Sequence, residues 1–378
     1  MKRFKRFAAF GISMLLTISM LASCSEEEQA DEPGVNKYRQ EGNRITATLG
    51  EKLTVDAELV GMPESDAAAV LQVKWDDDMG LETVEEVLFP GETDLEENSG
   101  TVHSPQKNSY LMYNQEGLGM IYTTTALSEK LYEAIVDWEQ EGNYRWEISE
   151  DFSEDVELDG YSKEQAISDV RDQLEQLGIT AEEAPYVIYG LNAEAMQSIY
   201  EDILASGRLD RLPVQYQNIQ YTKEDEAYQM LWHLSIEGIP VLSGNLRSNV
   251  VNDNIVSSAL ENGCLVDVIV TRDQILKLNS FFQYAMTSAG EEEKLLSVGE
   301  ILASVQDYYS NQNLMRARKV EKISYCYIPV QKDASAEKNS DYDMIPGWCI
   351  EVSRESVPGE SIYWDVLCVN GITGEIIP

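Results

Sequence analysis

Side chains that commonly perform catalytic or metal chemistry are few in this chain of 378 residues. It has only two histidines, His103 and His233, which are far apart in the sequence. The sequence contains no His-Glu-x-x-His zinc pair, no Gly-x-Ser-x-Gly nucleophile elbow, no phosphate loop and no dinucleotide-binding glycine pattern. A zinc site built from histidine ligands is therefore not expected, and we predict neither a cofactor nor an enzymatic activity.

One acidic cluster has a composition that suits Ca²⁺, namely Asp76-Asp77-Asp78-Met79-Gly80. An EF-hand loop needs a ligand at its fifth position and glycine at its sixth. Counted from Asp76, however, Gly80 is fifth. Because acidic runs are usually solvated, we expect a solvated loop, and whether Ca²⁺ binds at Asp76–Asp78 stays open.

Four cysteines follow Cys24 in the chain: Cys264, Cys326, Cys349 and Cys368. They form no Cys-x-x-Cys motif. The last three lie in consecutive predicted strands, so two could face each other, and export would permit a disulfide. Small buried thiols are the alternative. We favour that alternative because the chain has no dense disulfide framework, while the disulfide state itself stays open.

The N-terminus has the pattern of a secretory signal. Four basic residues lie within the first six positions, and an apolar run from Phe7 to Ala22 follows. The segment Leu21-Ala22-Ser23-Cys24 then resembles the lipobox of bacterial lipoproteins, in which signal peptidase II cuts before a cysteine that carries lipid. The resemblance implies a signal peptide at 1–23, lipid attachment at Cys24 and an acidic tether at 24–43. An ordinary signal with a chance cysteine and an uncleaved anchor helix are the alternatives.

The charge balance restricts the partners. The chain carries 67 acidic and 28 basic residues, and removal of residues 1–23 would take away four basic residues and no acidic one. Such a chain is unsuited to nucleic acid, whose phosphates need Lys and Arg. It is equally unsuited to lying flat on anionic lipid. We therefore expect no nucleic-acid partner.

The elements that follow predict an α+β fold in three parts. Residues 44–157 form a β-rich N-terminal domain, with a hairpin between Tyr110–Tyr113 and Leu118–Tyr122. A first α+β module at 158–280 begins with a helix capped by Ser162. A second module at 281–378 begins with a helix capped by Ser297. Each cap is followed three residues later by Gln or Glu, which is the capping-box pattern, and antiparallel strands follow each helix.

Both modules, roughly residues 158–378, resemble the PepSY and YycH/YycI-type extracytoplasmic modules. In the first module, the stretch from Tyr228 to Val241, which ends Gly238-Ile239-Pro240-Val241, is similar to an earlier strand pair of that family. The resemblance rests on short motifs: Tyr325-x-Tyr327-x-Pro329, Pro346-Gly347-Trp348 and Val369-Asn370-Gly371-x-Thr373-Gly374-Glu375. The family's turn has Ala where this chain has Gly371. The whole chain also resembles uncharacterised lipoproteins of Gram-positive anaerobes. The resemblance implies fold and location: YycH/YycI-type proteins regulate a cell-wall-sensing kinase, PepSY modules are thought to restrain proteases, and neither is an enzyme family.

The sequence therefore predicts a lipoprotein on the outer face of the cytoplasmic membrane. We expect it to have a non-catalytic binding or regulatory role toward a membrane or cell-wall protein. One alternative is a solute-binding lipoprotein for a sugar or peptide, although the alternating βαβ pattern of two-lobed binding proteins is missing. A second alternative is a two-carboxylate cell-wall or glycan hydrolase, for which the abundant carboxylates supply no specific pair.

The lipid anchor is directly testable. In the variant Cys24→Ala, the thiol that would receive the lipid is missing, so the precursor should remain uncleaved by signal peptidase II. Metabolic labelling with a fatty acid, followed by a gel shift, measures both effects. Normal cleavage and labelling of the variant would refute the lipid claim.

Overall fold

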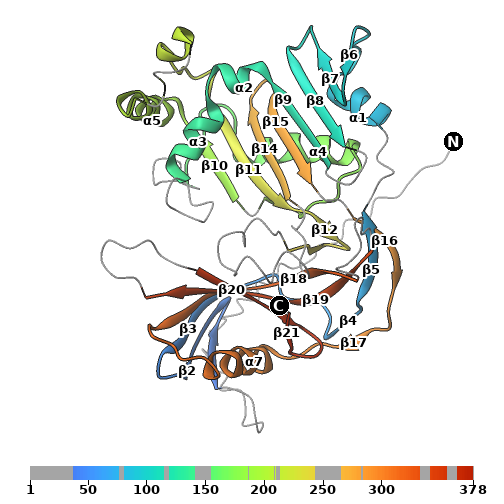
Figure 1. The fold of residues 1–378 in the computed structure, drawn as a ribbon, viewed down its shortest axis with the longest axis vertical. Coiled ribbons are helices and arrows are strands. Elements are labelled where there is room, and N and C mark those ends of the chain that lie inside the picture. Colours follow the sequence, from blue (N-terminus) through green and yellow to red (C-terminus); the bar gives the residue numbers. More distant parts are fainter. Residues whose placement is uncertain are drawn as a thin grey trace, which may run out of the picture.

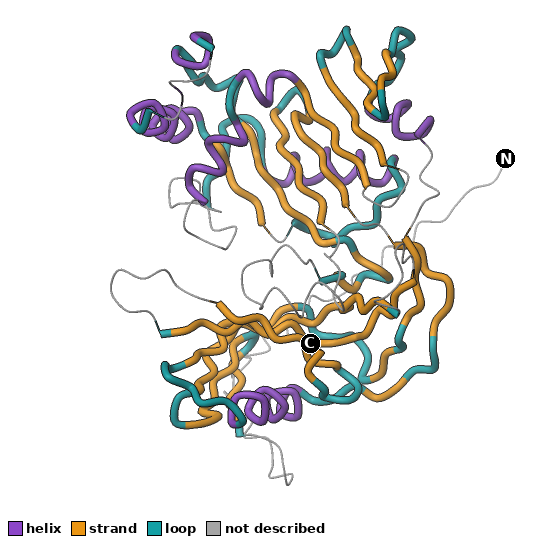
Figure 2. The backbone as a smooth tube through the Cα atoms, viewed as in Figure 1, coloured by secondary structure: helices purple, strands orange, loops and turns teal. Residues whose placement is uncertain are grey.

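The computed structural model describes residues 37–75, 81–114, 119–140, 155–185, 187–207, 209, 213–242, 265–281, 284–332, 341–355 and 364–377. It is a mixed α+β protein with more strand than helix (Figure 2). The predicted α+β fold class is therefore confirmed. Two large sheets lie one above the other in Figure 1, and we name them the upper and lower sheets.

The lower sheet has nine described strands and is built from both ends of the chain. Its main spatial order is β1 (Tyr38–Glu41), β2 (Arg44–Gly50), β3 (Leu53–Val60), β18 (Arg318–Gln331), β19 (Asp341–Arg354), β20 (Trp364–Asn370) and β21 (Ile376–Ile377). Strand β5 (Leu71–Trp75) pairs with β19, and β16 (Tyr284–Ala289) pairs with β5. All these pairings are antiparallel except β3 with β18, which is parallel. The alternate residues of β3 point into the core, beginning with Leu53 and Val55, as expected of a half-buried strand.

Helix α7 (Val298–Ser310) covers one face of the lower sheet (Figure 1). The predicted capping box is complete: the Ser297 hydroxyl accepts from the Glu300 amide, and the Glu300 carboxylate accepts from the Ser297 amide. The apolar stripe of the helix, including Ile301 and Val305, packs in one core with Trp348 of β19.

The upper sheet has eight described strands. Its order is β10 (Val187–Leu191), β11 (Ala227–His233), β14 (Leu265–Thr271), β15 (Ile275–Phe281), β9 (Gly119–Thr124), β8 (Ser109–Asn114), β7 (Thr101–Ser104) and β6 (Glu96–Asn98). All neighbouring pairs are antiparallel. The predicted hairpin is confirmed as β8–β9.

Helices lie on both faces of the upper sheet. Helix α4 (Lys163–Gln176) begins at Ser162, whose side chain accepts from the Gln165 amide as predicted. It packs on one face near α1 (Leu81–Leu88). Helices α3 (Tyr132–Gln140) and α5 (Ala193–Ala205) lie on the other face at the β10–β11 end, with the short α2 (Thr125–Glu129) beside α3 (Figure 1).

The sheets divide the chain differently from the predicted domains 44–157, 158–280 and 281–378. Strands β1–β3 and β5, expected in a separate N-terminal domain, belong to the lower sheet with the C-terminal strands. Strands β6–β9, expected in the same domain, belong to the upper sheet. The physical reason is long-range pairing: β3 is paired with β18, and β9 is paired with β15.

The upper sheet is an insertion into the lower one. The chain leaves the lower sheet at Trp75 and re-enters it at Tyr284, and these two residues are paired in the β5–β16 ladder. Insertion of one unit into another is tolerated when the two ends of the inserted unit lie close together. The register at Trp75 and Tyr284 meets this condition.

A continuous apolar core joins the two sheets. It contains Val73 of β5 and Tyr342 of β19 from the lower sheet, together with Trp232 and Val268 from the upper sheet and Val170 of α4. A small hairpin, β12 (Ser235–Ile236) with β13 (Ile239–Pro240), adds a second connection between the two sheets. Val241, which follows β13, forms a parallel bridge with Tyr327 of β18. The inserted unit is therefore packed on the lower sheet by side chains as well as by strand pairing.

Gly347 of β19 tests the packing of the lower sheet. A Cβ added there would lie 2.6 Å from the Val369 carbonyl oxygen, so Gly347→Ala should lower the free energy of unfolding by about 1–3 kcal/mol. The matched control is Gly50→Ala, whose new Cβ would meet no atom closer than 4.0 Å. Urea unfolding followed by circular dichroism measures both variants, and equal midpoints would contradict the packing described.

Candidate functional site

The structure does not unite the residues that the sequence singled out. Cys24, the Asp76–Asp78 loop and Cys264 lie outside the described residues. His103 lies in β7 and His233 in β11, and four strands of the upper sheet separate them. His233 is paired instead with Glu182, whose carboxylate lies 3.0 Å from its Nδ1. The two histidines therefore belong to no common site.

The described part of the chain offers neither a cluster of metal ligands nor a helix that could span a membrane. Within the ranges described above, no group of three or more His, Cys, Asp or Glu residues is arranged to hold a metal ion. No described helix is long and apolar enough to cross a membrane.

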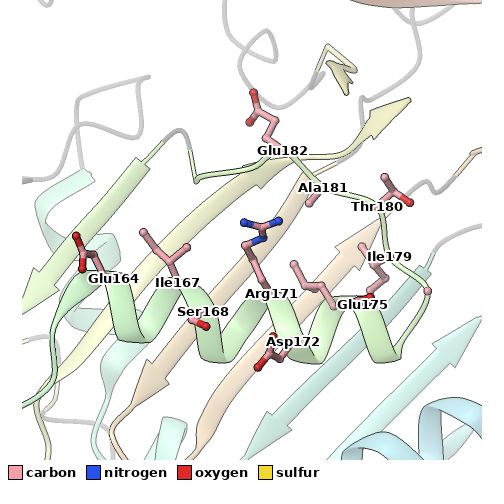
Figure 3. A pocket seen from close by; sticks show the side chains of 12 residues that line it. Glu164, Ile167, Ser168, Arg171, Asp172, Glu175, Ile179, Thr180, Ala181 and Glu182 are labelled. Atoms are coloured by element: carbon pink, nitrogen blue, oxygen red, sulfur yellow. The ribbon is translucent and has the colours of Figure 1, made fainter. Parts of the chain in front are cut away.

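A groove runs along α4, between this helix and the chain segment that follows it (Figure 3). Its volume is about 660 Å³, and it lies between α4 and the segment 178–182 that follows it. Arg171 lies toward this segment, and four acidic side chains also line the groove: Glu164, Asp172, Glu175 and Glu182. The groove is open and its charged groups are largely exposed. Such a surface is well solvated, so a ligand would gain little by displacing water from it.

The second surface is the part of the upper sheet that α3 and α5 leave uncovered, which we name the open face. It lies over β7, β8, β9 and β15 (Figure 1), and its residues share one side of the sheet by alternation and register: Thr101, His103, Tyr110, Met112, Ile121, Thr123, Lys277 and Asn279. All eight are partly or fully exposed, whereas the alternate residues behind them, such as Leu111 and Leu278, are completely buried.

Large apolar groups are concentrated on strand β8 of the open face. Tyr110 is 39% exposed and Met112 is 48% exposed. The His103 ring stacks on Tyr110 with ring centroids 4.5 Å apart and an interplanar angle of 14°. Its Nδ1 also lies 3.4 Å from the Glu96 carboxylate. The contact fixes a flat pair of rings on an exposed sheet.

A charged cluster borders the open face next to α3. Lys277 of β15 lies 2.8 Å from Asp267 of β14 and 3.0 Å from Glu133 of α3, and its side chain is only 12% exposed. Burial alone would lower the pKa of Lys277, but the charges and hydrogen bonds of Asp267 and Glu133 outweigh it, so the pKa is raised. The amine is therefore protonated at neutral pH and serves as a cation that ties α3 to the sheet, not as a base.

The sequence contained little signal for the Lys277 cluster. Asp267 interrupts an otherwise apolar strand, which is the one local sign of a buried polar contact. Its partners cannot be read locally, because Lys277 is on the next strand and Glu133 is on a helix from a distant part of the chain.

Comparison with known proteins bears on the fold alone. No protein-family model and no curated protein matches this chain. The structure is similar to the crystal structure of an uncharacterized protein from Eubacterium rectale, a member of the Clostridia. That likeness has a TM-score of 0.57 and 16% sequence identity, and it covers 89% of this chain and 93% of the other. A bacterial protein of different sequence thus shares a fold similar to this one.

The Lys277 cluster gives a stability prediction. Lys277→Met would leave Asp267 buried without its cation, so the free energy of unfolding should fall by about 3–5 kcal/mol. The control is Lys223→Met, which removes a pair with Asp159 whose side chains are 72% and 82% exposed. The control should leave the urea midpoint nearly unchanged, because exposed pairs contribute little. A similar small effect of both variants would show that the cluster does not hold α3.

Proposed function

We propose that this protein is a lipid-anchored lipoprotein with a non-catalytic binding or regulatory role, and that its open face binds a membrane or cell-wall protein. The N-terminal signal and Cys24 support the anchor and the outer face of the membrane. The open face carries the binding role, because it exposes Tyr110 and Met112 on β8, where both residues are paired with a neighbouring strand on each side.

The composition of the open face favours a protein partner. Tyr and Met are enriched at protein–protein interfaces, and aromatic anchors carry much of the binding energy. Tyr110 and Met112 are each paired with β7 on one side and with β9 on the other, so this part of β8 does not need to reorganise on binding.

The tether limits where the partner can be. The tether expected at 24–43 is too long, because residues 38–41 pair with β2 as strand β1. For the remaining length of about 14 residues, flexible-chain statistics give a mean span of about 20 Å, at roughly 5–6 Å × √n. The protein would therefore work close to the membrane, where tethering raises the effective concentration and a modest affinity is sufficient.

The resemblance to PepSY and YycH/YycI-type modules supports the same location. Its motif residues have structural contacts in this chain. The Tyr325 and Trp348 rings pack 5.2 Å apart, and the Asn370 side chain accepts from the backbone amides of Ile372 and Thr373. Gly374 has a φ of +76°, which favours glycine. These residues maintain the fold of the module and leave the open face as the binding surface.

The stacked His103–Tyr110 pair also favours the solute-binding alternative. A flat, exposed aromatic pair could receive a sugar ring, since small-ligand sites combine apolar surfaces with a few polar groups. A sugar ligand would occupy the same face without any protein partner.

Photo-crosslinking separates these functions. A photoreactive amino acid replaces Met112 in the full chain, and the control replaces Met315, which is 82% exposed elsewhere. In native membranes, position 112 should yield one discrete protein adduct that position 315 does not, and adding Tyr110→Ala should reduce its yield several-fold. If neither position yields an adduct, or both yield the same ones, a protein partner on the open face is wrong.

A further inference from the structure

We propose that Cys349 and Cys368 form a disulfide between neighbouring strands of the lower sheet. Cys349 lies on β19 and Cys368 on β20, and the register places them directly opposite each other. Residues opposite each other in a ladder project from the same face of the sheet. The two thiols therefore share one face, the face turned away from α7, in a small core with Ile328 and Leu242.

The pattern of ladder hydrogen bonds identifies the type of pair. The Gly371 amide donates to the Pro346 carbonyl at 2.8 Å, so these two residues form a hydrogen-bonded position of the β19–β20 ladder. Such positions alternate along an antiparallel ladder. Three residues further along, Cys349 and Cys368 occupy a non-hydrogen-bonded position. The Cα atoms of such a pair are about 4.5 Å apart and its side chains are closest, which is within the range that a disulfide spans.

A third thiol, Cys326, is the nearby competitor against which the choice of partner can be tested. Cys326 on β18 lies opposite Gly347, so it is on the same face as Cys349 but diagonal to it. All three side chains are buried, with exposures of 4%, 6% and 0% for Cys326, Cys349 and Cys368. Diagonal neighbours are about 7–8 Å apart, too far for a disulfide without movement of the backbone. The geometry thus selects Cys368, not Cys326, as the partner of Cys349.

The chemistry requires a disulfide-bearing oxidant, such as oxidised glutathione or an extracytoplasmic thiol oxidoreductase. One protein thiolate attacks the oxidant and forms a mixed disulfide, releasing one thiol. The second protein thiolate then attacks that mixed disulfide. The products are the Cys349–Cys368 bond and two reduced oxidant thiols, which receive the two electrons and the two protons.

Folding determines when this bond forms. Contact with Cys368 and burial raise the pKa of Cys349, so the reactive thiolate is scarce once β20 is docked. Oxidation should therefore accompany folding. The inference rests on the proposed function only for the oxidising surroundings, which export would provide. The register of β19 and β20 determines which cysteine is the partner.

The test uses the full chain in detergent, unfolded in guanidinium and refolded in a buffer of reduced and oxidised glutathione. Acid quenching, alkylation, proteolysis and mass spectrometry then identify the linked peptides. The Cys349–Cys368 link should dominate, and it should persist in Cys326→Ala, the matched control on the same face. The oxidised chain should also melt roughly 5 °C above the reduced chain, and this difference should vanish in Cys368→Ala.

Two outcomes would overturn the proposal: alkylation of both Cys349 and Cys368 after refolding, or a Cys326 link as abundant as the Cys368 link. If Cys368→Ala fails to refold, the control variant and the unaltered chain still decide the result through their linked peptides. None of these measurements depends on a partner protein or on Cys24, so failure of the disulfide and failure of the proposed function are separable.

Discussion

Strand β5 pairs with β19 on one side and with β16 on the other. The β5–β16 pairing holds together the two points where the chain leaves and re-enters the lower sheet. The whole upper sheet lies between Trp75 and Tyr284, which are themselves paired. The shared core around Tyr342 and Trp232 then packs the inserted unit on its base. The open face can serve as a rigid binding surface because both ends of the unit that carries it are fixed at one place.

Local signals in the sequence predicted local structure well. The caps at Ser162 and Ser297 begin helices where expected, because a cap depends on residues within one turn. The β8–β9 hairpin follows from alternation around a turn. The domain boundaries did not follow, because the parallel pairing of β3 with β18 joins segments more than 250 residues apart. No periodicity within either strand specifies such a partner.

The candidate site was less predictable than the fold. His103 and Tyr110 are unremarkable in sequence, and their stacking arises from the β7–β8 register. The exposure of Met112 depends on which part of the sheet α3 and α5 leave uncovered. The cysteines gave a partial signal: their strands were predicted, but the opposition of Cys349 and Cys368 needed the β19–β20 register. In each case the missing information was long-range: the register between strands for the rings and the cysteines, and the placement of the helices on the sheet for Met112.

We expect the inserted sheet to present its open face to a protein at the membrane, and hydroxyl-radical footprinting can detect that contact. Methionine and tyrosine side chains are oxidised when solvent reaches them, so the method reports on the side chains that define this face. Met286, 50% exposed on β16, and Met315 are internal references away from the open face. Met112 and Tyr110 should be oxidised several-fold more slowly in native membranes than in the purified chain, while the oxidation of Met286 and Met315 should be unchanged. Equal oxidation of Met112 in both preparations would contradict this expectation.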